Sequence, residues 1–496
     1  MNPKQNSLAR YLFPRLQDFL FILLFLFLIL FGSNLFRDGD PGRHITVGNY
    51  MIENRTIVTS DIFSTTMAGQ PITPHEWLAQ LAFGVSYKIL GLAGVVFLIS
   101  LVISISIVLV YREVVKRGIP HLWAIFLAIW CAAMTSAHWL ARPHVFTFLF
   151  LALWTPGLLQ LSKGEKKTIW QFPLIMLIWA NTHGAFIAGF LVWGAIVAGW
   201  VWEHRASIKA EKTLLYKLIL TGVVAFLATF FNPAGWKLWA TSIGYITNRY
   251  LTQFTQEYRS LDFHNINAWP FLIFVAVSFI ILTRSWKKLP LSESFLLASW
   301  FPLALYSGRN MPLFAIIAVP IMAGYSVPRV SAISFLKNLV TPIKNLEIHL
   351  KGFLWSFIVV LTIFLLLFSG HKLDYPREGY NFNSSEFPVA AVAWLENNPQ
   401  NGNMFNFCRW GGYLLYRQWP QQNVFIDGQT DFYGETLTRQ YEQVISAQEG
   451  WKEILDSYQV QWMIIPPGTS LALKLYTESE WVPLYQDSTT VIFRHQ

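Results

Sequence analysis

Apolar stretches of helix length follow one another along most of the chain and are separated by polar connections. A helix that crosses the hydrocarbon core of a membrane needs roughly 20 apolar residues, or somewhat fewer when its ends carry long polar side chains. On this criterion the sequence predicts about eleven spanning helices, at residues 16–36, 92–111, 121–137, 145–161, 169–182, 185–202, 213–231, 269–283, 291–306, 311–327 and 353–370. The tight connections at His183 and Arg309 are also compatible with broken or re-entrant helices.

The connections fall into two alternating classes. One class is rich in Lys and Arg, at Arg112, Lys116, Arg117, Lys163, Lys166, Lys167, Arg205, Lys209, Lys212, Arg284, Lys287, Lys288, Arg329, Lys337, Lys344 and Lys351. The other class is poor in Lys and rich in Asp, His, Asn, Trp and Pro, at residues 38–75, 138–144, 181–184, 232–264 and 309–310. Cytoplasmic loops carry an excess of Lys and Arg. The basic class is therefore predicted to be cytoplasmic, and the second class shares one extracytoplasmic surface.

Two of the predicted extracytoplasmic loops are long. The first, residues 37–91, contains two amphipathic segments at 41–52 and 74–90, and we expect both to lie along the bilayer surface. The second, residues 232–268, carries the aromatic mixture that is typical of a membrane interface: Trp236, Trp239, Tyr245, Tyr250 and, just beyond it, Trp269.

The pattern changes at about residue 371, where short apolar runs begin to alternate with amphipathic ones. Strands are predicted at Met404–Cys408, Val424–Ile426, Gln461–Pro466, Val482–Tyr485 and Thr490–Arg494, and helices at 388–396, 438–447, 450–458 and 470–477. We therefore predict a polytopic α-helical membrane domain over residues 1–370, followed by a small extracytoplasmic α/β domain over residues 371–496.

Composition supports this fold class. Of the 496 residues 54% are hydrophobic and 13% are charged, which is too apolar for a soluble domain. The basic connections account for most of the net charge of +9, so no nucleic-acid partner is expected. Cys131 and Cys408 do not make a disulfide framework. The first apolar run follows Lys4, Arg10 and Arg15 and lacks a small-residue cleavage site, which indicates a retained anchor with a cytoplasmic N-terminus.

Two aspartates follow the first predicted span directly. Asp38 and Asp40 could share a divalent cation, or act as a general base and the group that orients it. His44 lies four residues after Asp40, so a helix that begins at Pro41 directs both side chains to one face. Asp40 is also a good helix N-cap before a proline, and capping is compatible with a chemical role.

Further along this loop, Thr73 and Glu76 have the spacing of a capping box. That role explains Thr73 and Pro74 but leaves His75 without a capping reason. His75 and Glu76 are thus candidates for either the site or the scaffold. Asp61 is a further candidate, although its position favours turn formation slightly.

Three other predicted extracytoplasmic turns carry polar side chains. They contain His138, Arg142 and His144, then Asn181 and His183, then Arg309. A single histidine near a helix end is more often a structural residue, but ionisable groups at membrane depth are costly and are candidates for function. Guanidinium beside imidazole suits a phosphate, because Arg offers a planar fork of donors and a permanent charge.

Motifs of soluble enzymes are not found: the sequence has no Walker A loop, no dinucleotide-binding glycine turn and no His-Glu-x-x-His. Asp427 and Asp431 lie in a turn after an apolar run, where a structural role is favoured and acceptor contacts remain an alternative.

The ordered set DGDPGRHITVG, SDIFSTTMAGQPITPHEWL, ARPHVF, WANTHGAF and NPAGW, with FNFCRWGGYLL and VFIDGQTDFYG near the end, resembles the GT-C superfamily of membrane glycosyltransferases. The resemblance extends over nearly the whole chain. It implies a polyprenyl-phosphate-linked sugar donor, a lipid bilayer around the protein, and a catalytic aspartate in the first outside loop, at Asp40 or Asp38. It also implies a bacterial inner or plasma membrane location.

The resulting hypothesis is an inverting glycosyl transfer at the extracytoplasmic face, to a glycan, lipid or protein acceptor. Asp40 or Asp38 would act as base, and a divalent cation held by these two aspartates is an open possibility. Substrate-binding candidates are His44, Asp61, His75, Glu76, Arg142, His144, Asn181, His183 and Arg309. One alternative is an oligosaccharyltransferase or glycan ligase that uses a pyrophosphate-linked lipid. A more distant alternative is a lipid or glycan transporter, for which paired repeats would be expected.

Overall fold

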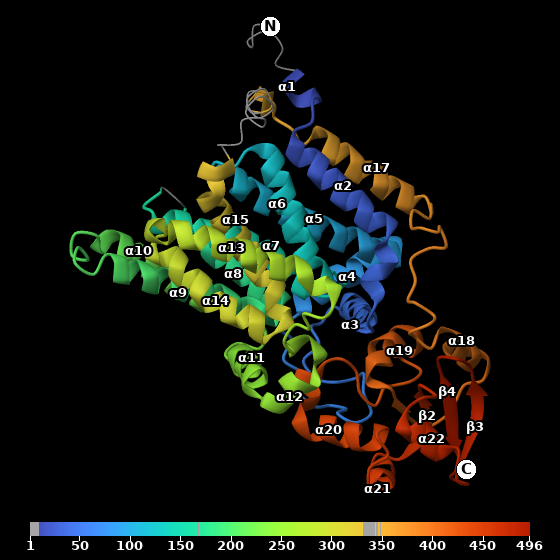
Figure 1. Cartoon of the computed structure of the whole chain (residues 1–496). Coiled ribbons are helices and arrows are strands. Elements are labelled where there is room, and N and C mark those ends of the chain that lie inside the picture. Colours follow the sequence, from blue (N-terminus) through green and yellow to red (C-terminus); the bar gives the residue numbers. More distant parts are fainter. Residues whose placement is uncertain (1–8, 166–167, 331–342, 344–345, 348) are drawn as a thin grey trace.

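The computed structural model describes residues 9–165, 168–330, 343, 346–347 and 349–496. Figure 1 shows a bundle of long helices joined to a smaller domain that contains the strands and the C-terminus. Some of the basic residues used to infer the cytoplasmic side lie outside the described residues, namely Lys4, Lys166, Lys167, Lys337 and Lys344.

Every apolar segment predicted to span the membrane forms a helix. After a short α1 (Ala9–Leu12), these helices are α2 (Leu16–Leu30), α5 (Leu92–Lys116), α6 (His121–Thr135), α7 (His144–Ser162), α8 (Gln171–Thr182), α9 (Ile187–Glu203), α10 (Lys212–Thr229), α13 (Trp269–Ser285), α14 (Leu291–Tyr306), α15 (Met311–Val330) and α17 (Leu354–Phe368). Short 3₁₀ turns, Gly184–Phe186 and Gly308–Asn310, separate α8 from α9 and α14 from α15.

Within the described residues, seven helical stretches are long and apolar enough to cross a membrane. These stretches do not include α8, α14, α15 or α17, so the count of about eleven spans stays a prediction. The stretch that contains α13 has only 17% of its apolar window buried inside the protein. Apolar side chains that are not covered by protein need lipid around them. The chain is an integral membrane protein.

The first long loop contains α3 (Asp40–Asn54) and α4 (Trp77–Leu90), where the two amphipathic segments were predicted. The helices cross closely at glycines, since a Cβ on Gly48 would lie 2.0 Å from the carbonyl oxygen of Gln80. On its other side α3 meets α19 (Gly411–Gln418), where a Cβ on Gly42 would lie 2.4 Å from the Gly412 oxygen. Thus α3 packs between two protein elements, α4 and α19. Its predicted position along the bilayer surface stays a prediction.

The second long loop contains α11 (Lys237–Thr247), α12 (Arg249–Phe254) and a 3₁₀ turn at Gln256–Tyr258. Figure 1 shows α11 and α12 between the bundle and the C-terminal domain. They contact α20 (Thr430–Ile445): Tyr245 shares a hydrogen bond with Thr430, and Asn248 donates to Glu435 at 3.0 Å. Tyr245, one of the aromatic residues predicted for the membrane interface, therefore contacts the C-terminal domain.

The C-terminal domain is built on a four-stranded sheet with the order β1-β2-β4-β3. The pair β1/β2 is parallel, whereas β2/β4 and β3/β4 are antiparallel. Its elements are α18 (Val389–Asn397), β1 (Asn403–Asn406), α19, α20, α21 (Trp451–Ser457), β2 (Val460–Ile465), α22 (Ser470–Leu475), β3 (Trp481–Gln486) and β4 (Val491–His495). Four of the predicted strands are present, and α19 was not predicted.

The prediction of a strand at Val424–Ile426 is wrong. This segment is buried but makes only an isolated parallel bridge, between Val424 and Ser64 of the first loop. The side chain of Asn406 supplies what a neighbouring strand would have supplied: its Oδ1 accepts from Phe425 N at 2.7 Å, and its Nδ2 donates to Ile426 O at 2.9 Å. The Asn406 amide thus forms hydrogen bonds with backbone groups of Phe425 and Ile426. This apolar segment can therefore be buried without pairing with a strand of the sheet.

A buried ion pair joins the first loop to the C-terminal domain. Arg43 Nε on α3 donates to Asp427 Oδ2 at 2.9 Å, and both side chains are at most 5% exposed. Asp427 was interpreted as structural, and this contact gives it a structural partner. Charges removed from water stay ionised only when they are paired.

Replacing Asp427 with Ala leaves the Arg43 guanidinium buried and unpaired, so we expect unfolding to become easier by about 3–5 kcal/mol. The measurement is denaturant or thermal unfolding of the detergent-solubilised protein. Glu53→Ala, which removes the exposed pair with Lys88 at 3.0 Å, is the matched control and is expected to cost about 0–1 kcal/mol. Equal losses in the two variants would contradict the role of the buried pair.

Candidate active site

Most of the predicted site residues line one cavity of about 330 Å³. Its walls come from the start of α3, the segment before α4, the turn before α7, the start of α9, the second long loop, the turn before α15 and the segment 428–431. The predicted residues that line it are Asp40, His44, His75, Glu76, Arg142, His144, His183 and Arg309. Segments from the whole length of the chain thus bring polar side chains to one place.

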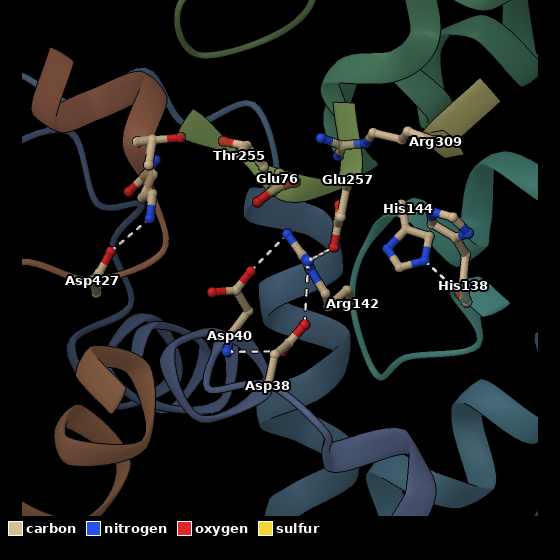
Figure 2. Close-up of polar contacts among 12 residues, drawn as sticks. Asp38, Asp40, Glu76, His138, Arg142, His144, Thr255, Glu257, Arg309 and Asp427 are labelled. Carbon is tan, nitrogen blue, oxygen red and sulfur yellow. Dashed lines mark hydrogen bonds and ion pairs between the residues drawn. The ribbon is translucent and has the colours of Figure 1, made fainter. Parts of the chain in front are cut away.

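Arg142 is the centre of this group, and it contacts three carboxylates. Its Nη1 lies 3.2 Å from Asp38 Oδ2 and 2.5 Å from Glu257 Oε1, and its Nη2 lies 2.7 Å from Asp40 Oδ2. Figure 2 shows Asp38, Asp40 and Glu257 around Arg142, the two aspartates from one segment and the glutamate from another. Asp38 Oδ1 also accepts a hydrogen bond from the Asp40 backbone nitrogen at 3.1 Å, which fixes the bend before α3.

One guanidinium cannot neutralise three ionised carboxylates. The pKa values of Asp38 and Glu257 therefore shift in opposite directions. Burial, together with the neighbouring charges of Asp40 and Glu257 and against the opposing effect of Arg142, raises the pKa of Asp38 to about 7. Burial also raises the pKa of Glu257, but Arg142 and Arg309 outweigh it and lower that pKa below its ordinary value. Asp38 therefore binds a proton at a higher pH than Glu257 does.

A second polar group forms around His75. Its Nε2 lies 3.8 Å from Asp431 Oδ2 and 3.9 Å from Glu76 Oε1, and its Nδ1 donates to the Thr73 carbonyl at 3.0 Å. Burial alone would lower the pKa of His75, but Asp431 and Glu76 raise it overall. Burial raises the pKa of Glu76. The group thus contains two acids, and an imidazole that is easily protonated.

Arg309 occupies another side of the cavity. It donates to Tyr258 Oη at 3.1 Å, and its Nη2 lies 3.4 Å from His183 Nε2. Because a guanidinium only donates, His183 Nε2 accepts, and His183 Nδ1 carries the proton towards Thr147 Oγ1 at 2.9 Å. Burial and Arg309 lower the pKa of His183, which keeps this imidazole neutral.

The other predicted histidines have more structural surroundings. His144 Nε2 donates to the His138 carbonyl at 2.7 Å, which closes the turn that carries Arg142 (Figure 2). His44 packs its ring on Phe83, and burial lowers its pKa well below the ordinary value. Both rings still contribute to the cavity wall.

Three predicted residues do not line the cavity. Asp61 accepts from Phe63 N, Ser64 N and Ser64 Oγ, which shapes the turn that meets Val424. Asn181 accepts from Trp77 Nε1 at 2.6 Å and from Asn232 Nδ2 at 3.1 Å, so it ties α4 to the start of the second loop. Asp38 does not line the cavity either and reaches it through Arg142.

Sequence reasoning missed Glu257, Tyr258 and Tyr245, and it favoured a structural role for Asp431. All except Glu257 line the cavity, and Glu257 binds Arg142 beside it. The signal that could have identified Glu257 was a carboxylate in a long loop already assigned to the same side as Arg142.

The suggested cation site at Asp38 and Asp40 does not fit this geometry. The Arg142 guanidinium already lies between the two carboxylates, where the ion would be bound. In the part of the chain that the structure describes, no group of three or more His, Cys, Asp or Glu side chains is arranged to hold a metal ion.

Neither a protein-family model nor a curated protein matches the sequence. Solved structures do match over almost the whole chain. The oligosaccharyltransferase of Archaeoglobus fulgidus in its apo form has a TM-score of 0.63 at 10% identity, over 99% of this chain and 75% of that chain. AglB from the same organism, in complex with an inhibitory peptide and a dolichol-phosphate, has a TM-score of 0.60 at 11% identity, over 97% and 74%.

A different enzyme also aligns. ArnT from Cupriavidus metallidurans in the apo state has a TM-score of 0.53 at 12% identity, over 95% of this chain and 97% of that chain. The same protein bound to undecaprenyl phosphate has a TM-score of 0.50. Identities this low show the fold alone: the chain shares its fold with the Archaeoglobus fulgidus oligosaccharyltransferase and with ArnT.

Proposed function

We propose that the protein is a membrane glycosyltransferase that moves a sugar from a polyprenyl-phosphate donor to an acceptor hydroxyl, with inversion, on the extracytoplasmic face. The observation that carries this proposal is the form of the cavity, which is polar and acidic around Asp40 and apolar where it meets the membrane helices. The neighbours of known structure support the choice of lipid, because one of them was solved with a dolichol-phosphate and another with undecaprenyl phosphate.

The apolar side of the cavity supports entry of the donor from the bilayer. It is lined by Ile187, Ala188 and Leu191 on α9, and by Trp300, Leu303 and Tyr306 on α14. Leu191 is 49% exposed and Tyr306 is 74% exposed, so this wall reaches the outer surface of the helical bundle. An isoprenoid chain could therefore stay in lipid while its phosphate enters the polar part.

The two arginines suit different tasks. Arg142 is already engaged by three carboxylates, whereas Arg309 is held by an aromatic hydroxyl and a neutral imidazole. Arg309, with His183, is thus the better candidate to bind the phosphate and to stabilise the charge that develops as it leaves. Arg142 and His144 border the same space and complete the set suggested by the sequence.

Asp40 is the proposed general base. It would take the proton from the acceptor hydroxyl while the hydroxyl oxygen bonds to the anomeric carbon and the bond to the phosphate breaks. The Asp40 carboxylate lies against the C-terminal domain. A Cβ on Gly428 would be 2.0 Å from Asp40 Oδ1, so a side chain at position 428 would clash with the carboxylate. Glu76, His75 and Asp431 lie where they could orient the acceptor or the sugar.

A second candidate is an oligosaccharyltransferase or glycan ligase that uses a pyrophosphate-linked lipid. The higher TM-scores of the Archaeoglobus fulgidus structures favour it as the alternative. The two candidates differ in the donor, so mass spectrometry of the lipid that co-purifies with the protein distinguishes a single-sugar monophosphate from a glycan on a pyrophosphate.

We expect Asp40→Asn to lower the transfer rate by about 10²–10⁴-fold, because the amide cannot accept the acceptor proton. The measurement is transfer from a panel of polyprenyl-phosphate sugars by purified protein in detergent, with thermal unfolding to confirm the fold. The control is Asp262→Asn, which should keep the wild-type rate. Asp262 is exposed in the second loop, and its carboxylate accepts a hydrogen bond from the His264 backbone nitrogen. Full activity in Asp40→Asn refutes the assignment.

The raised pKa of Asp38 makes stability depend on pH. The folded protein keeps the proton up to a pKa of about 7, whereas the unfolded chain releases it near 3.8. The resulting stabilisation is complete below about pH 4 and is lost as the pH rises through about 7. We therefore expect the melting temperature of the wild type to fall more steeply between pH 5 and 8 than that of Asp38→Asn. Parallel pH profiles for the two proteins would contradict a buried, protonated Asp38.

We expect Leu191→Trp to obstruct the apolar wall. The variant should co-purify with less polyprenyl lipid and show a raised KM for the donor, since the indole occupies space near the proposed entry of the lipid chain. Leu227→Trp on α10 is the matched control, because Leu227 is similarly exposed at 53% and does not line the cavity. Quantified bound lipid and donor KM are the measurements. If Leu191→Trp has the same amount of bound lipid and the same donor KM as the wild type, the lipid does not enter along this wall.

A further inference from the structure

Three carboxylates converge on one buried side chain from two loops that are far apart in the sequence. Asp38 and Asp40 come from the start of the first loop and Glu257 from the second, and their oxygens lie 2.5–3.2 Å from the Arg142 nitrogens. Convergent carboxylate oxygens are the ligands that hard divalent cations prefer. The cluster therefore contains the type of ligand that a cation prefers, but its oxygens are arranged around a guanidinium and not, among the described residues, around a metal position.

The guanidinium is held there by its own geometry. Its planar fork directs Nη1 towards Asp38 and Glu257 and Nη2 towards Asp40, and its side chain is only 17% exposed. The turn that carries it is closed by the hydrogen bond from His144 to His138, and Pro143 follows directly. Arg309 adds a second positive charge on another side of the same cavity. A dication would meet repulsion from both arginines, so the ion and Arg142 exclude one another.

We propose that the Arg142 guanidinium takes the place of a divalent cation in this site, and that removing it opens a cation site formed by Asp38, Asp40 and Glu257. Arg142 then holds the first and second long loops together through its contacts with their carboxylates. A bound cation would be exchangeable, whereas this side chain is not. Arg142 acts as a positioning residue for Asp40, and the importance of this for catalysis rests on the proposed function. The cation chemistry of the cluster can be measured without any transfer assay.

The test is Mn²⁺ binding to the full-length, chelator-treated protein in detergent, followed by electron paramagnetic resonance. We expect no site at the cluster in the wild type. Arg142→Ala should bind one Mn²⁺ at least about tenfold more tightly than the wild type, because the repulsion is gone and three carboxylates remain. Arg142→Gln preserves more of the side-chain volume and carries the same expectation if the alanine variant does not fold. Arg309→Ala is the matched control, since it removes a cavity arginine that is not held by the three carboxylates, and it should create no site.

Adding Glu257→Gln to Arg142→Ala should weaken the new site, which locates the ion at the cluster. Two results overturn the proposal. One is Mn²⁺ binding to the wild type that Asp40→Asn abolishes. The other is a folded Arg142→Ala or Arg142→Gln protein, shown by its melting curve and gel filtration, that binds no more Mn²⁺ than Arg309→Ala. A protein that transfers no sugar under any condition would refute the proposed function and leave these binding results unchanged.

Discussion

The buried charge of Arg142 is the constraint on which the cavity depends. A guanidinium at this depth is tolerable only when acceptors surround it, and those acceptors come from the first and second long loops. Pairing the charge therefore fixes both loops relative to the turn before α7. The same logic recurs at Arg43, which brings the C-terminal domain against α3. Two arginines thus assemble a site whose parts are separated by most of the chain.

Close backbone packing makes these charge contacts possible. α3 approaches α4 at Gly48 and α19 at Gly42, so it is enclosed by protein while its first turn presents Asp40 to the cavity. The second loop covers the opposite side and continues into contacts with α20. Acidic groups, Arg43 and Arg142 then line one cavity with side chains that are largely withdrawn from solvent. Under such conditions, electrostatic interactions are stronger and protonation states depart from those of exposed groups.

Sequence alone predicted what is local. Apolar length located the helices of the bundle, and amphipathic spacing located α3 and α4, because both depend on residues near one another in the chain. The predicted sidedness grouped Asp40, Arg142, His183 and Arg309, and these four residues line one cavity. The sequence could not show which side chains these four residues contact. Glu257 was missed because its partner lies in a distant turn, and Val424–Ile426 was predicted as a strand because nothing local reveals that Asn406 satisfies its backbone.

The contact of Gly428 with Asp40 has a consequence for how the protein matures. The ribosome makes α3 well before residues 427–431, so Asp40 is synthesised before the segment that closes this side of the cavity. An incomplete nascent chain, or one cut before residue 427, lacks that wall even when every helix of the bundle is inserted. The cavity is therefore complete only once residues 427–431 are made, and a product that lacks them would carry Asp40 without this part of its surroundings.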